Sequence, residues 1–173
     1  QTSTYVQEAP GKNKGYEYAR SQNPTRKALE DAYAIIENAK YGLAFGSGVA
    51  ATDAVIKLLN PGDEVILFEP YYQYHINALV AVEAVPVAVS MQPPAWSYSM
   101  DQLEEVVTPR TKAIIVNSPG NPSGKVYSQS ELEAVAEFAC RHDLFVLTDE
   151  IYEYFLYDGR RHISMASLPE MAE

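Results

Sequence analysis

Apolar runs alternate with helix-like stretches along most of this chain, and this alternation limits its fold more than any other feature. The predicted strands are residues 41–45, 64–68, 84–89, 113–117 and 144–148, and the predicted helices are residues 25–38, 49–59, 72–82, 101–107 and 130–142. Strands that are apolar throughout and are joined by helices are typical of a parallel sheet. We therefore expect an α/β fold with a mostly parallel sheet, helices on both of its faces, and Thr25 as the cap of the first helix.

The composition is that of a globular protein and argues against some partners. Of the 173 residues, 47% are hydrophobic and 21% are charged, which fits one domain of ordinary size. A formal net charge of -10 repels the phosphates of nucleic acids and of anionic membranes, so we expect neither as a partner. No apolar stretch reaches the roughly 18 residues that span a bilayer, and the first residues do not resemble a signal peptide. A cytoplasmic protein is therefore expected.

The first residues differ in character from the rest of the chain. Residues 1–22 are polar and rich in tyrosine, and they predict an N-terminal arm, followed by a partial domain over residues 23–173. The single cysteine, Cys140, excludes an internal disulfide, and its helical surroundings predict a buried thiol. The histidines show no metal-ligand spacing, so we expect them in core or surface roles and predict no metal site. They are His75, His142 and His162.

Glycine and serine follow the first predicted strand, at the start of a helix. Backbone N–H groups and the positive end of a helix dipole at Gly46-Ser47-Gly48 suit a phosphate group. The same residues also fit a tight turn in which Ser47 is only a helix cap. A third reading is a dinucleotide fingerprint, Gly46-x-Gly48-x-x-Ala51, with Glu69 at the end of the next strand. An NAD-binding oxidoreductase is therefore one alternative.

Polar residues also follow the later strands, at the edge where open parallel sheets bind their ligands. Asp149 ends a buried strand, where its carboxylate would hold a metal, orient a loop or pair with a cationic ring nitrogen. Tyr72 follows another strand and would either stack on a planar ligand or pack in the core. The residues alone leave these alternatives open.

Several motifs resemble known families. Asn117-Ser-Pro-Gly-Asn-Pro-Ser-Gly124, followed after a helix by Leu147-Thr-Asp-Glu-Ile-Tyr152, resembles the class I/II aminotransferases of the aspartate aminotransferase type. So do the runs 60–72 and 108–115. In contrast, residues 16–25 and 40–51 resemble the cystathionine synthase and lyase family of Cys/Met metabolism. Both families share one fold and the cofactor pyridoxal 5'-phosphate (PLP), so the chain is similar to a truncated PLP-binding domain or a chimera of two.

The resemblance implies which residues bind PLP. Around the phosphate, Gly48 and Val49 would donate backbone N–H groups, with Ser47 beside them. Tyr18 and Arg20 match positions that reach the phosphate of a neighbouring subunit in the Cys/Met family, which implies a homo-oligomer, either a dimer or a larger assembly.

Four more residues would surround the PLP ring. Tyr72 would stack on it, and Asn121 and Tyr152 would reach its phenolic oxygen. Asp149 would pair with the ring nitrogen, because a nearby anion favours the protonated nitrogen.

The resemblance implies an aminotransferase that moves an amino group between an amino acid and a 2-oxo acid. A carbon–sulfur lyase or synthase of the cystathionine type is the second alternative, and a catalytically inert fragment or hybrid is another. Both families place their Schiff-base lysine well after the aspartate motif, and no lysine follows Asp149 here. The aminotransferase C-terminal domain, with its arginine for the substrate carboxylate, is also missing. We therefore identify no catalytic residue and do not expect this chain to catalyse transamination unaided.

Overall fold

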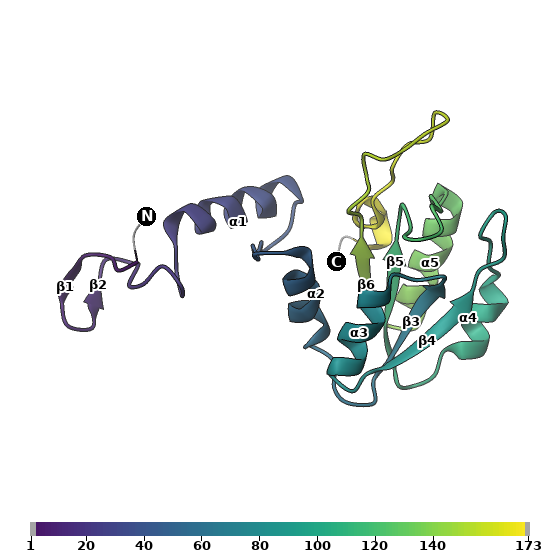
Figure 1. Ribbon diagram of the computed structural model, residues 1–173, viewed down its shortest axis with the longest axis horizontal. Helices are drawn as coiled ribbons and strands as arrows, with labels where there is room; N and C mark the ends of the chain where they lie inside the picture. Colours follow the sequence, from purple (N-terminus) through teal and green to yellow (C-terminus); the bar gives the residue numbers. More distant parts are fainter. Residues whose placement is uncertain (1–2, 172–173) are drawn as a thin grey trace. The chain divides into compact units, whose positions relative to one another are not determined.

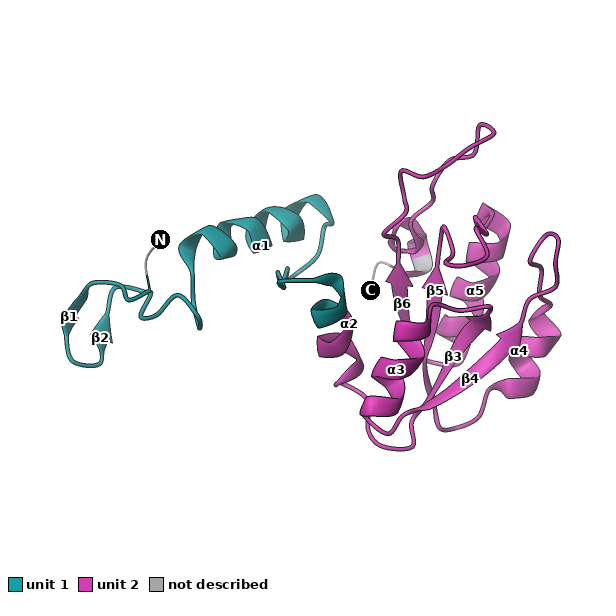
Figure 2. Ribbon diagram, viewed as in Figure 1, with its two compact units in different colours: residues 1–51 teal, residues 52–173 magenta. Residues whose placement is uncertain are grey.

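A computed structural model describes residues 3–171 of the chain (Figure 1). The chain divides into two compact units, residues 1–51 and residues 52–173 (Figure 2). The division falls within helix α2 (Gly48–Ile56). The boundary of the N-terminal arm after residue 22, with one partial domain following it, stays a prediction.

The first unit holds a small hairpin and one long helix. Strands β1 (Gln7–Ala9) and β2 (Lys12–Asn13) pair in antiparallel fashion, and helix α1 spans Pro24–Ile36. The expectation that Thr25 caps α1 was wrong. The side-chain oxygen of Asn23 accepts hydrogen bonds from the backbone N–H of Thr25, at 2.9 Å, and of Arg26, at 3.2 Å. Pro24 then takes the first helical position, where its missing N–H costs nothing.

The predicted strand over residues 41–45 does not form. A strand needs a neighbour for its backbone groups, and these residues belong to no sheet in the described part of the chain. The N–H of Ala44 donates instead to the Glu30 carboxylate on α1, at 3.0 Å. The apolar sequence suggested a buried strand, but Leu43 and Phe45 are exposed.

The second unit is built on a four-stranded parallel sheet in the order β4-β3-β5-β6, which confirms the expected α/β class. Its strands are β3 (Glu64–Glu69), β4 (Val85–Ser90), β5 (Thr111–Asn117) and β6 (Phe145–Asp149). Its other helices are α3 (Gln73–Ala81), α4 (Met100–Val106) and α5 (Gln129–Arg141), followed by the short 3-10 turns Met165–Ser167 and Pro169–Met171. Each strand lies within a residue or two of its predicted position.

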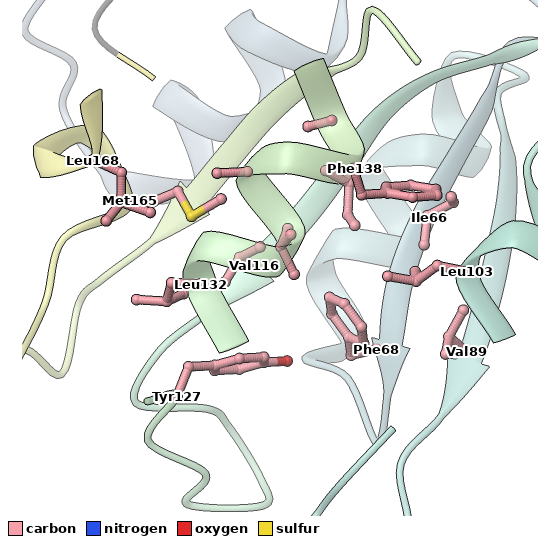
Figure 3. Packing of buried hydrophobic residues seen from close by; sticks show 14 of the residues in the cluster. Ile66, Phe68, Val89, Leu103, Val116, Tyr127, Leu132, Phe138, Met165 and Leu168 are labelled. Atoms are coloured by element: carbon pink, nitrogen blue, oxygen red, sulfur yellow. The ribbon is translucent and has the colours of Figure 1, made fainter. Parts of the chain in front are cut away.

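Two apolar clusters cover the two faces of this sheet. On one face Ile66 and Phe68 of β3 pack with Leu103 of α4 and Phe138 of α5 (Figure 3). On the other face the alternate residues of β3 pack with Leu79 of α3. Because successive side chains of a strand point to opposite faces, both of which are covered, β3 is apolar at every position from Val65 to Phe68 and is buried there. None of the described helices is long and apolar enough to cross a bilayer.

Cys140 is exposed, so the expectation of a buried thiol was wrong. It lies on α5, whose buried side is formed by Val135, Phe138 and Ala139 among others. At about 100° per residue, position 140 falls just outside this buried side, near the exposed Glu133 and Glu137. Membership of an amphipathic helix thus says little about burial until the angular position is known.

A buried carboxylate joins the amino ends of β3 and β5. Glu64 is 4% exposed and accepts hydrogen bonds from the hydroxyls of Thr108, at 2.5 Å, and Thr111, at 3.3 Å, and it pairs with Arg110. The Thr108 hydrogen bond holds the pKa of Glu64 below its ordinary value, against the effect of burial. Two of the runs that carry the family resemblance therefore meet at this edge of the sheet and serve its stability.

The central strand gives a direct test of the core. Ile114 is fully buried, so Ile114→Val should lower the free energy of unfolding by about 0.5–1.5 kcal/mol through the lost methylene. Ile151→Val makes the same chemical change at a side chain that is 72% exposed, and it should stay within about 0.5 kcal/mol of the parent. Urea unfolding of both variants measures the difference, and equal midpoints would contradict this description of the core.

Candidate functional site

The carboxyl ends of β5 and β6 bring two polar residues together. Asn117 and Asp149 end these strands and are partners in the parallel register. The Asn117 side chain donates from Nδ2 to the backbone oxygen of Asp149, at 2.9 Å, and accepts at Oδ1 from the backbone N–H of Asn121, at 2.7 Å. One amide thus holds the loop after β5 against the end of β6.

The Asp149 carboxylate is held by a buried histidine. His75 Nε2 lies 3.0 Å from Asp149 Oδ2, and the backbone N–H of Ile151 donates to Oδ1 at 3.3 Å. The His75 side chain is 5% exposed and that of Asp149 is 26% exposed. The hydrogen bond from His75 lowers the pKa of Asp149, while partial burial acts in the opposite direction. Asp149 is therefore a carboxylate, ionised at neutral pH, at the edge of the sheet where a ligand would bind.

His75 is a site residue that the sequence analysis missed. It lies on α3, three residues after Tyr72, and residues at this spacing share one side of a helix. The two rings meet edge to face, with centroids 5.5 Å apart and planes at 86°. The spacing was visible in the sequence, but the partner of His75 lies 74 residues away. The search for metal-ligand spacing could not find this pair.

Two cavities adjoin this network. The smaller, about 20 Å³, is lined by Tyr72, His75, Asn117 and Asn121, among others. The larger, about 580 Å³, has both Asn121 and Tyr152 in its wall. The structure therefore brings Tyr72, Asn121, Asp149 and Tyr152 to one edge of the sheet of the second unit, either along a cavity wall or one hydrogen bond from it. Their contacts to a ligand stay predictions.

The predicted phosphate-binding residues lie at the start of α2. Ser47 does cap this helix, since its hydroxyl accepts a hydrogen bond from the Ala50 N–H at 3.2 Å. Gly48 and Val49 are the first two residues of the helix, where backbone N–H groups point out of its end. A Cβ atom added at Gly46 or Gly48 would meet nothing within 4 Å, so there is room for a group to approach the backbone. The cap and a phosphate site are compatible.

Tyr18 and Arg20 lie next to each other in the first unit. The Arg20 guanidinium is 5.0 Å from the centroid of the Tyr18 ring, and Tyr18 forms a backbone bridge with Thr4. Both side chains are exposed. Among residues 3–171, no group of three or more histidine, cysteine, aspartate or glutamate side chains is placed to hold a metal ion.

The His75 contact makes a measurable prediction for Asp149. In His75→Phe the hydrogen bond is lost but the burial remains, so the pKa of Asp149 should rise above that of the parent. Carbon-13 NMR titration of the carboxyl groups measures this pKa. In the parent, the folded-state pKa lies below the unfolded value of about 3.9, so the contact adds stability above that pH. This contribution is lost as the pH falls through the folded-state pKa.

His142→Phe is the matched control for this titration. The His142 ring bonds to Glu104, at 3.1 Å, and not to Asp149. The pKa of Asp149 should therefore be the same as in the parent. An unchanged Asp149 pKa in His75→Phe would show that the contact does not stabilise the carboxylate.

Comparison with known proteins adds to this geometry. The family of Cys/Met metabolism PLP-dependent enzymes matches residues 1–154. The probable N-succinyldiaminopimelate aminotransferase DapC of Mycobacterium tuberculosis is 42% identical over 130 residues, which is 74% of this chain and 33% of that protein. Kynurenine–oxoglutarate transaminase 3 of Rattus norvegicus is 37% identical over 129 residues, or 69% of this chain and 28% of that protein.

Solved structures agree in fold. The N-succinyldiaminopimelate aminotransferase of Mycobacterium tuberculosis superimposes with a TM-score of 0.68 at 42% identity, over 72% of this chain and 33% of that one. The aromatic aminotransferase of Pyrococcus horikoshii OT3 gives a TM-score of 0.66 at 37% identity, over 70% of this chain and 33% of that one. The chain thus spans about a third of the length of the proteins that it matches.

Proposed function

The chain belongs to the family of Cys/Met metabolism PLP-dependent enzymes, and we propose that it is part of an aminotransferase acting between an amino acid and a 2-oxo acid. The relatives that match it are named aminotransferases or transaminases. They are about three times as long as the matched region, so the proposal concerns the activity to which this part contributes. PLP is the cofactor.

One observation carries the proposal, namely the ionised Asp149 held by His75 at the carboxyl edge of the sheet. When bound, PLP supplies a pyridine ring that draws electrons from the substrate, most strongly with its nitrogen protonated. Asp149 would hold that proton on the nitrogen, because its negative charge lies close by. His75 would keep Asp149 ionised and correctly oriented. Such a pair suits a cationic heteroaromatic ring better than an uncharged ligand.

Other residues of the chain fit the remaining parts of PLP. Tyr72 offers a ring face beside His75, and Asn121 and Tyr152 offer an amide and a hydroxyl from the cavity walls. In the first unit, Gly48 and Val49 at the start of α2 would bind the phosphate through their N–H groups. The match to PLP-dependent enzymes favours this phosphate over the pyrophosphate of NAD at the same residues.

We do not propose that the chain catalyses the reaction unaided. No lysine follows Asp149 in the sequence. Lys125 lines the larger cavity, but its side chain is 5% exposed and its Nζ lies 2.6 Å from Glu131 in an ion pair. The Lys125 side chain is therefore engaged by Glu131 and is not placed as a free nucleophile.

Titration with PLP, followed by borohydride reduction, tests the proposal. We expect saturable binding, seen by absorbance and fluorescence, with no covalent adduct on reduction. Peptide mapping would locate an adduct, and one on Lys125 would contradict the role of its ion pair. A chain that is folded but does not bind PLP would be an inert fragment or hybrid, and the proposed site would be wrong.

Asp149→Asn tests the residue on which the proposal depends. Removal of its charge should weaken PLP binding about tenfold or more, the effect of a lost hydrogen bond to a charged group. Asp143→Asn is the matched control, because Asp143 is exposed at a left-handed position (φ 54°) that asparagine also tolerates. Equal PLP affinity in the two variants would exclude the Asp149 role.

A carbon–sulfur lyase or synthase is the second candidate, favoured by the family match over residues 1–154. That match includes the cystathionine-like residues 16–51. The two activities differ in their products, since a lyase releases a thiol from a sulfur amino acid and an aminotransferase does not. Thiol release by a protein that contains this part and the missing lysine would favour the lyase.

We also propose that the protein is a homo-oligomer and is cytoplasmic. Support for the oligomer comes from Tyr18 and Arg20, which match positions that reach a neighbouring subunit. Arg20→Ala should then weaken PLP binding in the oligomer, while Lys14→Ala, an exposed change nearby, should not. Sedimentation velocity gives the assembly state, and a chain that is monomeric at every concentration would contradict the proposal.

A further inference from the structure

Glu150 uses both carboxylate oxygens to hold a later part of the chain. Oε1 accepts hydrogen bonds from the Ser164 hydroxyl, at 2.9 Å, and from the Met165 N–H, at 3.2 Å. Oε2 lies 2.9 Å from His162 Nε2. The three partners follow Glu150 by 12 to 15 residues, and the Glu150 side chain is 23% exposed. Three donors thus bind this partly buried carboxylate, which is next to Asp149 in the sequence.

These contacts close a loop at its base. Residues 151–161 leave the end of β6 and return, and Figure 1 shows them standing out beyond the sheet. The tip is the turn at Asp158 and Gly159, both with positive φ (57° and 73°). At the returning end, Met165 is 2% exposed and packs with Leu168 in the main core cluster. Glu150 directly precedes the loop, and its contacts therefore tie the start of the loop to Met165, which is anchored in the core.

The loop has little else to hold it. In the described part of the chain the Tyr152 side chain makes no hydrogen bond. Its ring meets that of Phe155, with the two ring centroids 5.8 Å apart. Tyr154 and Tyr157 are 87% and 73% exposed. A loop without strand pairing has few contacts of its own, so the position of these residues depends on the base of the loop.

The same loop forms one wall of the larger cavity. Its contributions are Tyr152, Phe155, Tyr157, Asp158 and Arg160. Other lining residues of this cavity are Trp96 and Asn121. A shift of the loop would therefore move Tyr152 and change the shape of this cavity.

We infer that Glu150 is a positioning residue, whose three hydrogen bonds fix the 151–161 loop and thereby hold Tyr152 and this cavity wall relative to Asp149. The part that concerns PLP rests on the proposed function, because Tyr152 is expected to reach the cofactor. A carboxylate suits the task because it accepts at both oxygens, whereas an amide would turn a donor toward His162 or Ser164. The contact with His162 uses a proton on Nε2, because a carboxylate oxygen can only accept a hydrogen bond.

The three hydrogen bonds of Glu150 are called the clasp below. Limited trypsin cleavage tests the clasp without any ligand. Glu150→Ala should raise the rate of cleavage after Arg160 or Arg161 about tenfold, because the freed loop enters the protease more readily. Glu150→Gln keeps one accepting oxygen and should give a smaller increase. Glu153→Ala is the control, since Glu153 is exposed in the same loop and its side chain makes no hydrogen bond or ion pair within residues 3–171. Equal cleavage rates in Glu150→Ala and the parent would overturn the inference.

A double-mutant cycle tests whether Glu150 acts through Tyr152. Glu150→Ala should weaken PLP binding about as much as Tyr152→Phe, and the double variant should be little weaker than either. Additive losses, or an unchanged PLP affinity in Glu150→Ala, would show that the clasp does not position Tyr152. If Glu150→Ala does not fold, Ser164→Ala removes one of the three donors and should give smaller effects of the same kind.

The two proposals fail in different ways. A parent chain that binds no PLP would refute the proposed cofactor site, and the inference on Glu150 would still be decided by the cleavage rates. A parent chain that binds PLP, together with unchanged cleavage in Glu150→Ala, would refute the clasp and leave the proposed function intact.

Discussion

The arrangement at the carboxyl edge of the sheet depends on the contact between Asp149 and His75. A carboxylate at the end of a half-buried strand loses hydration, and this loss has to be offset by a donor. His75 supplies that donor from α3, the helix between β3 and β4 along the chain. The contact therefore joins β6 to a helix that packs elsewhere on the sheet. Asn117 adds the link between β5 and β6 through the backbone oxygen of Asp149, so three elements meet at this one residue.

The sequence motifs at the two edges of the sheet have different roles. At the amino edge, Glu64 and its threonine partners hold β3 against the start of β5. At the carboxyl edge, Tyr72 and Asn121 line cavities, and Asp149 is bonded to His75, which lines the smaller one. Both edges hold a carboxylate with a lowered pKa, and cavities lie beside the carboxyl edge. A perturbed pKa by itself does not distinguish a structural ion pair from a binding site.

The sequence predicted what depends on neighbours along the chain. Strands β3 to β6 are continuous apolar runs, so their positions and parallel class followed from the pattern, as did the placing of Asp149 at a strand end. The prediction from sequence failed where the structure of a residue depends on a partner far along the chain. Residues 41–45 had no strand to pair with, His75 needed Asp149, and the side of α5 on which Cys140 lies was fixed by the sheet. The Glu150 contacts escaped notice for the same reason, although the residue stood beside Asp149.

The two outer strands of the sheet are not equivalent. β4 carries Pro86, which has no N–H to offer a further strand, whereas β6 contains no proline and Phe145 at its start is 76% exposed. The β4 border is therefore a poorer partner for a further strand than the β6 border. A parallel strand added beside β6 would end next to Asp149. The border that is better suited to growth of the sheet is thus also the one that carries the site.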